Sequence, residues 1–124
     1  MRFMMIVKHG ENSGAPPKEL MDAIAVIAEE AVKDGTMVAN GGLAPTAVSQ
    51  RVRLSRGQVT ALDGPFTESK EVVGGFAIIE FKSKEDAIEG AKQFMELHKK
   101  YWPGWEGETE VRQVLGPEAF DLKP

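Results

Sequence analysis

Two nearly continuous apolar runs of strand length constrain the fold of this sequence more than any other feature. They are residues 2–8, RFMMIVK, and residues 72–81, VVGGFAIIEF. A strand with one face in water alternates polar and apolar side chains, whereas these runs present apolar side chains to both faces. We therefore expect both strands to lie centrally in a sheet that is covered on two sides.

Two helical patterns supply a cover for one of those sides. The first runs from Lys18 to Asp34, and Gly35 follows it as the left-handed residue that often ends a helix. The second begins at SKED, residues 83–86, where the Ser83 hydroxyl can cap the first turn. Each pattern predicts one apolar face: Leu20, Ile24, Ile27, Ala28 and Ala31 in the first helix, and Ala87, Ile88, Ala91, Phe94 and Met95 in the second.

Three shorter stretches complete the predicted elements. Residues 36–45 and 109–115 have strand character, and residues 48–62 alternate and reverse at Arg56-Gly57, which predicts a β-hairpin. Without the hairpin, the order predicts an α+β fold of the ferredoxin-like βαββαβ type, with both helices on one face of an antiparallel sheet. A second copy packed sheet against sheet is the economical cover for the other face, so we expect a homodimer.

Length and composition narrow the class of protein. A chain of 124 residues suits a single domain over 1–124. Its 15 basic residues are scattered among 19 acidic ones, for a net charge of -4, which argues against nucleic acid as a partner. The first apolar run is too short for a secretory signal, and no run is long enough to span a membrane. We therefore expect a cytoplasmic protein without a membrane partner.

The sequence contains no familiar cofactor or metal motif. It has no cysteine, no glycine-rich nucleotide-binding motif, and only two histidines, His9 and His98, which lack the spacing of a metal site. We therefore expect neither a cofactor nor a metal. His98 lies near the end of the second predicted helix, where a cation favours the helix dipole, so a structural role is indicated.

The stretch DGPFTESKEVVGGF, residues 63–76, allows two interpretations. In the structural one, Asp63 accepts from the following backbone N–H groups and DGPF is only a rigid turn. In the functional one, the turn directs the Asp63 carboxylate and the Thr67 and Ser69 hydroxyls toward a cleft. Gly74 and Gly75 then leave room near the sheet for a ligand or a neighbouring backbone.

Three further features can carry a site. His9 follows an apolar strand and suits a general base, although a lone histidine in a glycine-rich loop is also a common solvated residue. Arg51 and Arg53 project from one side of the hairpin, where either can hold a carboxylate or face water. The loop YWPGWEGE, residues 101–108, can close one end of the core or a dimer interface, or cover an apolar ligand.

The DGPF turn with its downstream glycines resembles the signature of the DGPF, or YCII-related, family, and the resemblance extends over nearly the whole chain. It implies a ferredoxin-like subunit that dimerises as a dimeric α/β barrel with a cleft between sheet and helices. Members of that family are mostly of unknown function. Some are associated with sigma factors, and one branch resembles a dehydrochlorinase-type lyase.

One departure from the family pattern bears on activity. In the YCII branch, an Asp at the end of the first strand and a His early in the first helix form the implied active pair. Here His9 stands in place of that Asp, and the helix from Lys18 to Asp34 contains no His. The pair therefore cannot be transferred to this sequence.

Two functional hypotheses follow. As an enzyme, the chain would catalyse a lyase- or isomerase-like proton transfer on a small anionic molecule, with His9 as the base, Asp63 as its orienting partner or the acid, and Arg51 or Arg53 as the anchor. As a regulatory module without chemistry, it would bind a small ligand in the same cleft. A purely structural role is the third alternative.

Overall fold

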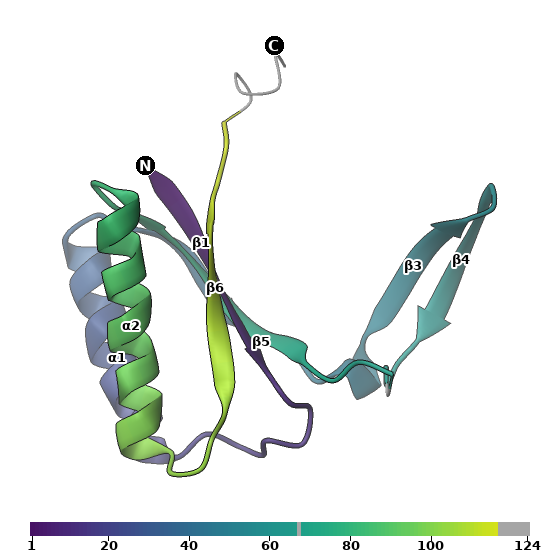
Figure 1. Cartoon of the computed structure of the whole chain (residues 1–124), viewed down its shortest axis with the longest axis horizontal. Coiled ribbons are helices and arrows are strands. Elements are labelled where there is room, and N and C mark those ends of the chain that lie inside the picture. The colour runs from purple at the N-terminus through teal and green to yellow at the C-terminus, as the bar shows by residue number, and fades with distance from the viewer. Residues whose placement is uncertain (67, 117–124) are drawn as a thin grey trace.

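The computed structural model describes residues 1–66 and 68–116, and over these residues it has two α-helices and six strands (Figure 1). Four strands form one antiparallel sheet in the order β2-β5-β1-β6, and the other two form a separate hairpin. This is the ferredoxin-like arrangement predicted from the order of the elements. The bounds are β1 Arg2–His9, α1 Lys18–Lys33, β2 Met37–Gly42, β3 Gln50–Ser55, β4 Gln58–Asp63, β5 Val72–Glu80, α2 Lys84–Tyr101 and β6 Gly107–Gln113, with a 3₁₀ helix, η1, at Thr46–Val48.

The helix ends follow from local signals in the sequence. The Ser83 hydroxyl accepts a hydrogen bond of 3.1 Å from the backbone N–H of Asp86 and so caps α2. Gly35 takes a φ of 74° just after α1, as the C-terminal signal predicts. Neither helix in the part of the chain that the structure describes is long and apolar enough to cross a membrane.

The hydrophobic core lies between the four-stranded sheet and the helices, which cover one face of that sheet (Figure 1). Phe3 and Met5 of β1 are buried there against Ala87 and Ala91 of α2. Leu20 of α1 is fully buried. The strand register sets neighbouring side chains on the same face, since Phe3 pairs with Ile79 and Met5 with Ala77.

The other face of the sheet also carries apolar side chains, as the two apolar runs predict. Met4 and Ile6 alternate with the core residues of β1 and are only half-buried. Their partners on β5 are Ile78 and Phe76, which are half-buried too. Ion pairs surround this apolar strip: Arg2 with Glu80 at one end, and Lys8 with Glu110 at the other, each at 2.5 Å.

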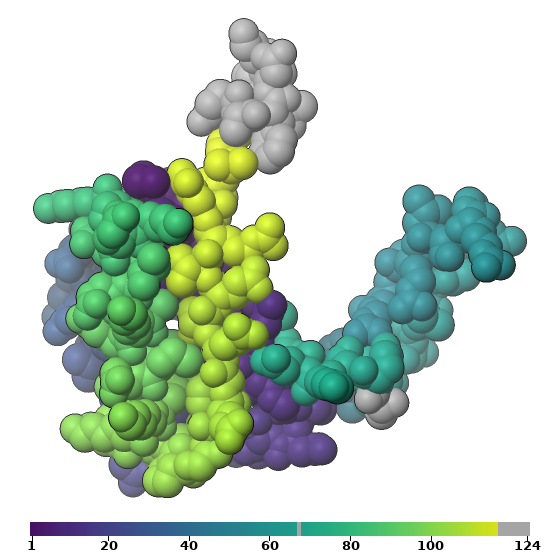
Figure 2. All heavy atoms as spheres, in the orientation of Figure 1, coloured from purple at the N-terminus to yellow at the C-terminus, as the bar shows by residue number. Residues whose placement is uncertain are grey.

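The β3–β4 hairpin projects from the rest of the molecule (Figures 1 and 2). It turns at Arg56-Gly57, as predicted, and both residues of the turn have positive φ. The register gives it one apolar face, because Leu54 pairs with Val59 and Val52 pairs with Ala61. Val52, Leu54 and Val59 are 70–74% exposed, so nothing within the described residues covers this face.

Candidate functional site

The segment after the hairpin forms one wall of a cavity of about 390 Å³. The cavity lies where the hairpin joins the four-stranded sheet, and it combines hydroxyl groups, an apolar wall and one guanidinium. Its polar and aromatic lining comes from η1 and its C-cap, from β3 and from the segment after β4: Thr46, Ser49, Arg51, Phe66, Ser69 and Glu71. The structure thus brings two predicted ligand residues, Arg51 and Ser69, into one cavity.

Arg51 is held on three sides by residues from the DGPFTES segment. Its guanidinium carbon lies 3.9 Å from the centre of the Phe66 ring, which is a cation–π distance. Nη2 donates to the Ser69 hydroxyl at 2.9 Å, and Nη1 forms an ion pair with Glu68. The guanidinium is therefore oriented by residues 15 to 18 positions further along the chain.

The DGPF turn is fixed to η1 by main-chain contacts. The Gly64 N–H donates to the Ser49 carbonyl at 2.8 Å, and the Phe66 N–H donates to the Thr46 hydroxyl at 3.3 Å. A Cβ on Gly64 would overlap the Thr46 carbonyl oxygen, so only glycine fits at this close approach. Thr46 in turn binds both carboxylate oxygens of Glu11, at 3.0 and 2.8 Å.

The charges near this cavity are unevenly distributed. Two hydrogen bonds hold the pKa of the Glu68 carboxyl below its usual value. The larger effect comes from the backbone N–H of Glu68 and the smaller from Arg51. Arg51 is the only cationic side chain that lines the cavity within the described residues, and Glu71 is a carboxylate on the same lining. One anionic group is the most that this lining can neutralise.

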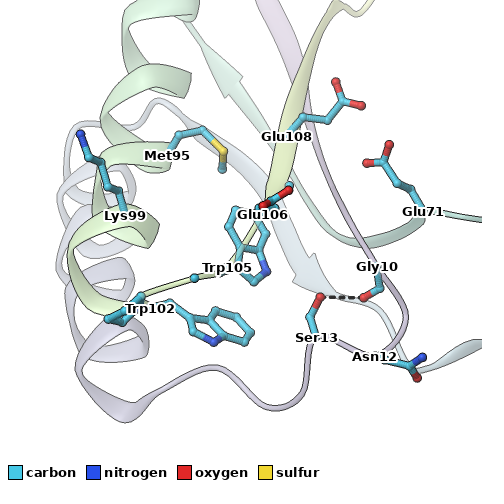
Figure 3. Close-up of a pocket in the computed structure, with 13 residues that line it drawn as sticks. Gly10, Asn12, Ser13, Glu71, Met95, Lys99, Trp102, Trp105, Glu106 and Glu108 are labelled. Atoms are coloured by element: carbon cyan, nitrogen blue, oxygen red, sulfur yellow. Dashed lines mark hydrogen bonds between the residues drawn. The ribbon is translucent and has the colours of Figure 1, made fainter.

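A second, larger cavity of about 1220 Å³ lies at the end of α2 (Figure 3). Trp102 and Trp105 line it with their rings stacked 5.8 Å apart. Trp105 also packs against His98 at 4.5 Å, and His98 is buried with its Nδ1 2.9 Å from the Phe94 carbonyl. The aromatic loop thus packs against the buried His98 and lines a cavity, and the role of His98 at the helix end stays a prediction.

His9 ends β1 and lies beside the lining of both cavities, although it lines neither. Its strand partner Val72 lines the smaller cavity, and Gly10 lines the larger one. The His9 Nδ1 lies 2.7 Å from the Gly10 carbonyl oxygen, which can only accept, so this nitrogen carries a proton. In the neutral ring, the free lone pair is therefore on Nε2.

The two predicted glycines make room for groups of this chain. A Cβ on Gly74 would overlap the imidazole of His9, so the ring occupies that space. A Cβ on Gly75 would lie 3.1 Å from the carbonyl oxygen of Gly41 on β2, so the close neighbour there is a backbone. Their contact with a ligand stays a prediction.

The remaining predicted residues lie away from these contacts. Asp63 ends β4 opposite Gln50, and Arg53 pairs with Thr60 in the hairpin; both are exposed, and neither lines the two cavities. Within residues 1–66 and 68–116, no hydrogen bond joins Asp63 to His9. Thr67 lies outside the described residues. The roles of these residues stay predictions.

Sequence reasoning did not identify Phe66, Glu68, Thr46 or Ser49 as lining or supporting residues of a site. Phe66 and Glu68 lie inside the DGPFTES stretch, but the sequence does not indicate their contacts with Arg51. Those contacts form only when the chain folds. Thr46 and Ser49 had no signal, because their proximity to the turn depends on the Gly64 contact.

The fold and this cavity define a ferredoxin-like α+β protein with an inserted hairpin, and the oriented guanidinium of Arg51 lies at the base of that hairpin. The family model of the YCII-related domain matches residues 1–99, and the chain belongs to that family. An uncharacterised protein of Rhizobium meliloti (strain 1021) is similar to the chain, with 29% identity over 75 residues that cover 60% of this chain and 60% of the relative. The chain thus spans 60% of the length of this relative.

Proposed function

We propose that the chain binds a small anionic molecule in the 390 Å³ cavity, with Arg51 as the anchor. The observation that carries this proposal is the orientation of the Arg51 guanidinium by Phe66, Ser69 and Glu68 at the edge of that cavity. A guanidinium presents paired donors that match a carboxylate or phosphate, and orientation before binding lowers the cost of binding. The cavity size is at the low end of small-molecule sites.

An Arg51→Gln variant tests this function. It removes the charge and the fork of donors, so affinity for acetate or inorganic phosphate should fall about tenfold or more. The measurement is an NMR titration of the folded protein. Arg53→Gln is the matched control, because Arg53 is exposed two residues along the same strand and should change affinity by less than about threefold.

Two results would count against the proposal. One is equal loss of affinity in both arginine variants, which would indicate only the general charge of the hairpin. The other is unchanged binding by Arg51→Gln together with a lower unfolding midpoint, which would leave Arg51 as a clamp on the turn. An Arg51→Lys variant, which keeps the charge and loses the fork, should bind with intermediate affinity.

A proton-transfer enzyme is the second candidate function, and the His9 ring supports it. Because Nδ1 donates to the Gly10 carbonyl, Nε2 carries the lone pair of the neutral ring and is the proposed acceptor of a proton from a carbon next to a carbonyl or carboxylate. The proton would pass to Nε2 and leave an enolate, and return of a solvent-derived proton would complete the exchange. Asp63 is the proposed acid, because the Gly10 carbonyl already accepts from the His9 Nδ1–H.

Exchange of carbon-bound hydrogen tests this candidate. With pyruvate in D₂O, the wild-type protein should speed deuterium incorporation into the methyl group, and His9→Gln should reduce that rate by about 100-fold. The NMR signal of the methyl protons reports the rate. A wild-type rate equal to that of buffer, in protein that still binds pyruvate, would assign the chain to ligand binding without chemistry.

We also propose that the chain acts as a homodimer. Two apolar surfaces support this: the strip around Ile6 and Phe76 on the sheet face opposite the helices, and the hairpin face around Leu54. Burying such surfaces against a second copy of the same chain removes them from water, which stabilises the dimer.

A further inference from the structure

We propose that Glu68 occupies the place of a ligand carboxylate on Arg51 in the free protein, and that the ligand is a short monocarboxylate with an apolar body. This inference rests on the proposed function and names the class of ligand. It also makes Glu68 a determinant of affinity, since the ligand has to displace it.

The Arg51 contacts favour an exchange of one carboxylate for another. Phe66 and Ser69 hold the guanidinium from the turn, whereas Glu68 holds it through a side chain that is 64% exposed. An exposed ion pair contributes little free energy, so Glu68 can rotate into solvent at small cost. The guanidinium would keep its other two contacts and accept the new carboxylate in the same geometry.

Ser69 offers a further donor to the ligand. Its hydroxyl oxygen accepts from Arg51 at 2.9 Å, and in the described part of the chain its own hydrogen is donated to no other group. By contrast, the Ser49 hydroxyl donates to the Pro45 carbonyl at 2.9 Å, and the Thr46 hydroxyl donates to Glu11. A carboxylate on Arg51 can therefore receive a second hydrogen bond from Ser69.

The remaining lining limits the charge and shape of the ligand. Arg51 is the one cationic side chain on the described lining, so the lining can neutralise one negative charge on the ligand. A monoanion is therefore favoured over phosphate or a dicarboxylate. The rest of the lining includes apolar side chains that suit a short hydrocarbon body: Leu43, Ala44, Phe66, Val72 and Val73.

The test follows the Arg51 Nε–H signal by NMR while butyrate is added to the full chain. Butyrate should shift this signal in the wild type, and Glu68→Gln should bind butyrate about threefold to fivefold more tightly, since a neutral amide competes less well for the guanidinium. Glu71→Gln removes the same charge from the lining without touching the Arg51 ion pair. It should change affinity by about twofold or less.

The outcomes separate this inference from the function on which it rests. Equal affinities of wild type and Glu68→Gln, or an equal gain in Glu71→Gln, would overturn the role of Glu68 while leaving anion binding in place. Tighter binding of inorganic phosphate than of butyrate would overturn the ligand class. Failure of both the wild type and Glu68→Gln to bind butyrate, acetate or phosphate would overturn the proposed function itself.

Discussion

Position decides the different roles of the two hairpin arginines. Arg51 lies at the base of β3, where the chain after β4 returns and places Phe66 and Ser69 against its guanidinium. Arg53 lies two residues further along β3, away from the base, and is exposed. A long charged side chain loses conformational freedom on binding, so a guanidinium that is already held loses less. Arg51 is therefore better suited than Arg53 as the anchor.

A substitution at Gly64 tests whether the close approach of the turn to η1 holds the site together. Gly64→Ala should lower the free energy of unfolding by about 1–3 kcal/mol, because the new methyl group overlaps the backbone of Thr46. Urea unfolding measures the change. Gly42→Ala is the control, since its Cβ would meet no atom closer than 3.9 Å and should cost less than about 1 kcal/mol. Equal costs for the two variants would contradict the tight contact.

At the scale of the elements, the hairpin depends on its base for its position. β3 and β4 pair with each other from Gln50–Asp63 to Ser55–Gln58, and two hydrogen bonds next to the first of these pairs close the base of the hairpin. They join Gly64 to Ser49 and Phe66 to Thr46. Thr46 lines the smaller cavity and also binds Glu11 in the loop after β1, so the orientation of the hairpin and the shape of the site depend on the same residue.

The helices, strands and their order were predictable because each has a local signal. Ser83 and Gly35 mark helix ends, and strand alternation separates Arg51 from Val52 on the hairpin. Two details depend on tertiary contacts. Strand β6 begins at Gly107, two residues before the predicted start, because Gly107 pairs with His9. Ile27 lies on the predicted apolar face of α1, yet it is exposed.

The site was predictable only in part, for a related reason. Arg51 and Ser69 carry recognisable chemistry, so residue type and strand side identified them as candidates. Their contact with each other, and with Phe66, spans the hairpin and the turn after it, and no local pattern indicates which side chains meet across that distance. No rule of spacing links Thr46 to the DGPF turn, since that link depends on a hydrogen bond from the Phe66 N–H to the Thr46 hydroxyl in the folded chain.

At the scale of the whole molecule, the hairpin projects from the body (Figures 1 and 2), and two apolar surfaces are left uncovered by the described residues, one on the sheet and one on the hairpin. An isolated two-stranded hairpin is marginally stable in water, and this one leaves Val52, Leu54 and Val59 largely exposed. The sheet adds the half-buried strip of Ile6 and Phe76. Both surfaces would gain from burial against another copy of the chain.

The mass in solution tests the homodimer. Light scattering at micromolar concentration should give twice the 13.5 kDa mass of the chain, because a strip and a hairpin face from each copy are buried together. Dilution should shift the mass toward that of one chain. A stable, monodisperse species of 13.5 kDa over the whole concentration range would contradict the dimer.

Binding at Arg51 is the central claim, and a crystal structure of the protein with butyrate at saturating concentration tests it most directly. We predict a carboxylate within about 3 Å of the Arg51 guanidinium, with Glu68 turned into solvent and the hydrocarbon against Phe66. An intact Arg51–Glu68 ion pair, with butyrate beside Trp102 and Trp105 or absent from the protein, would contradict it.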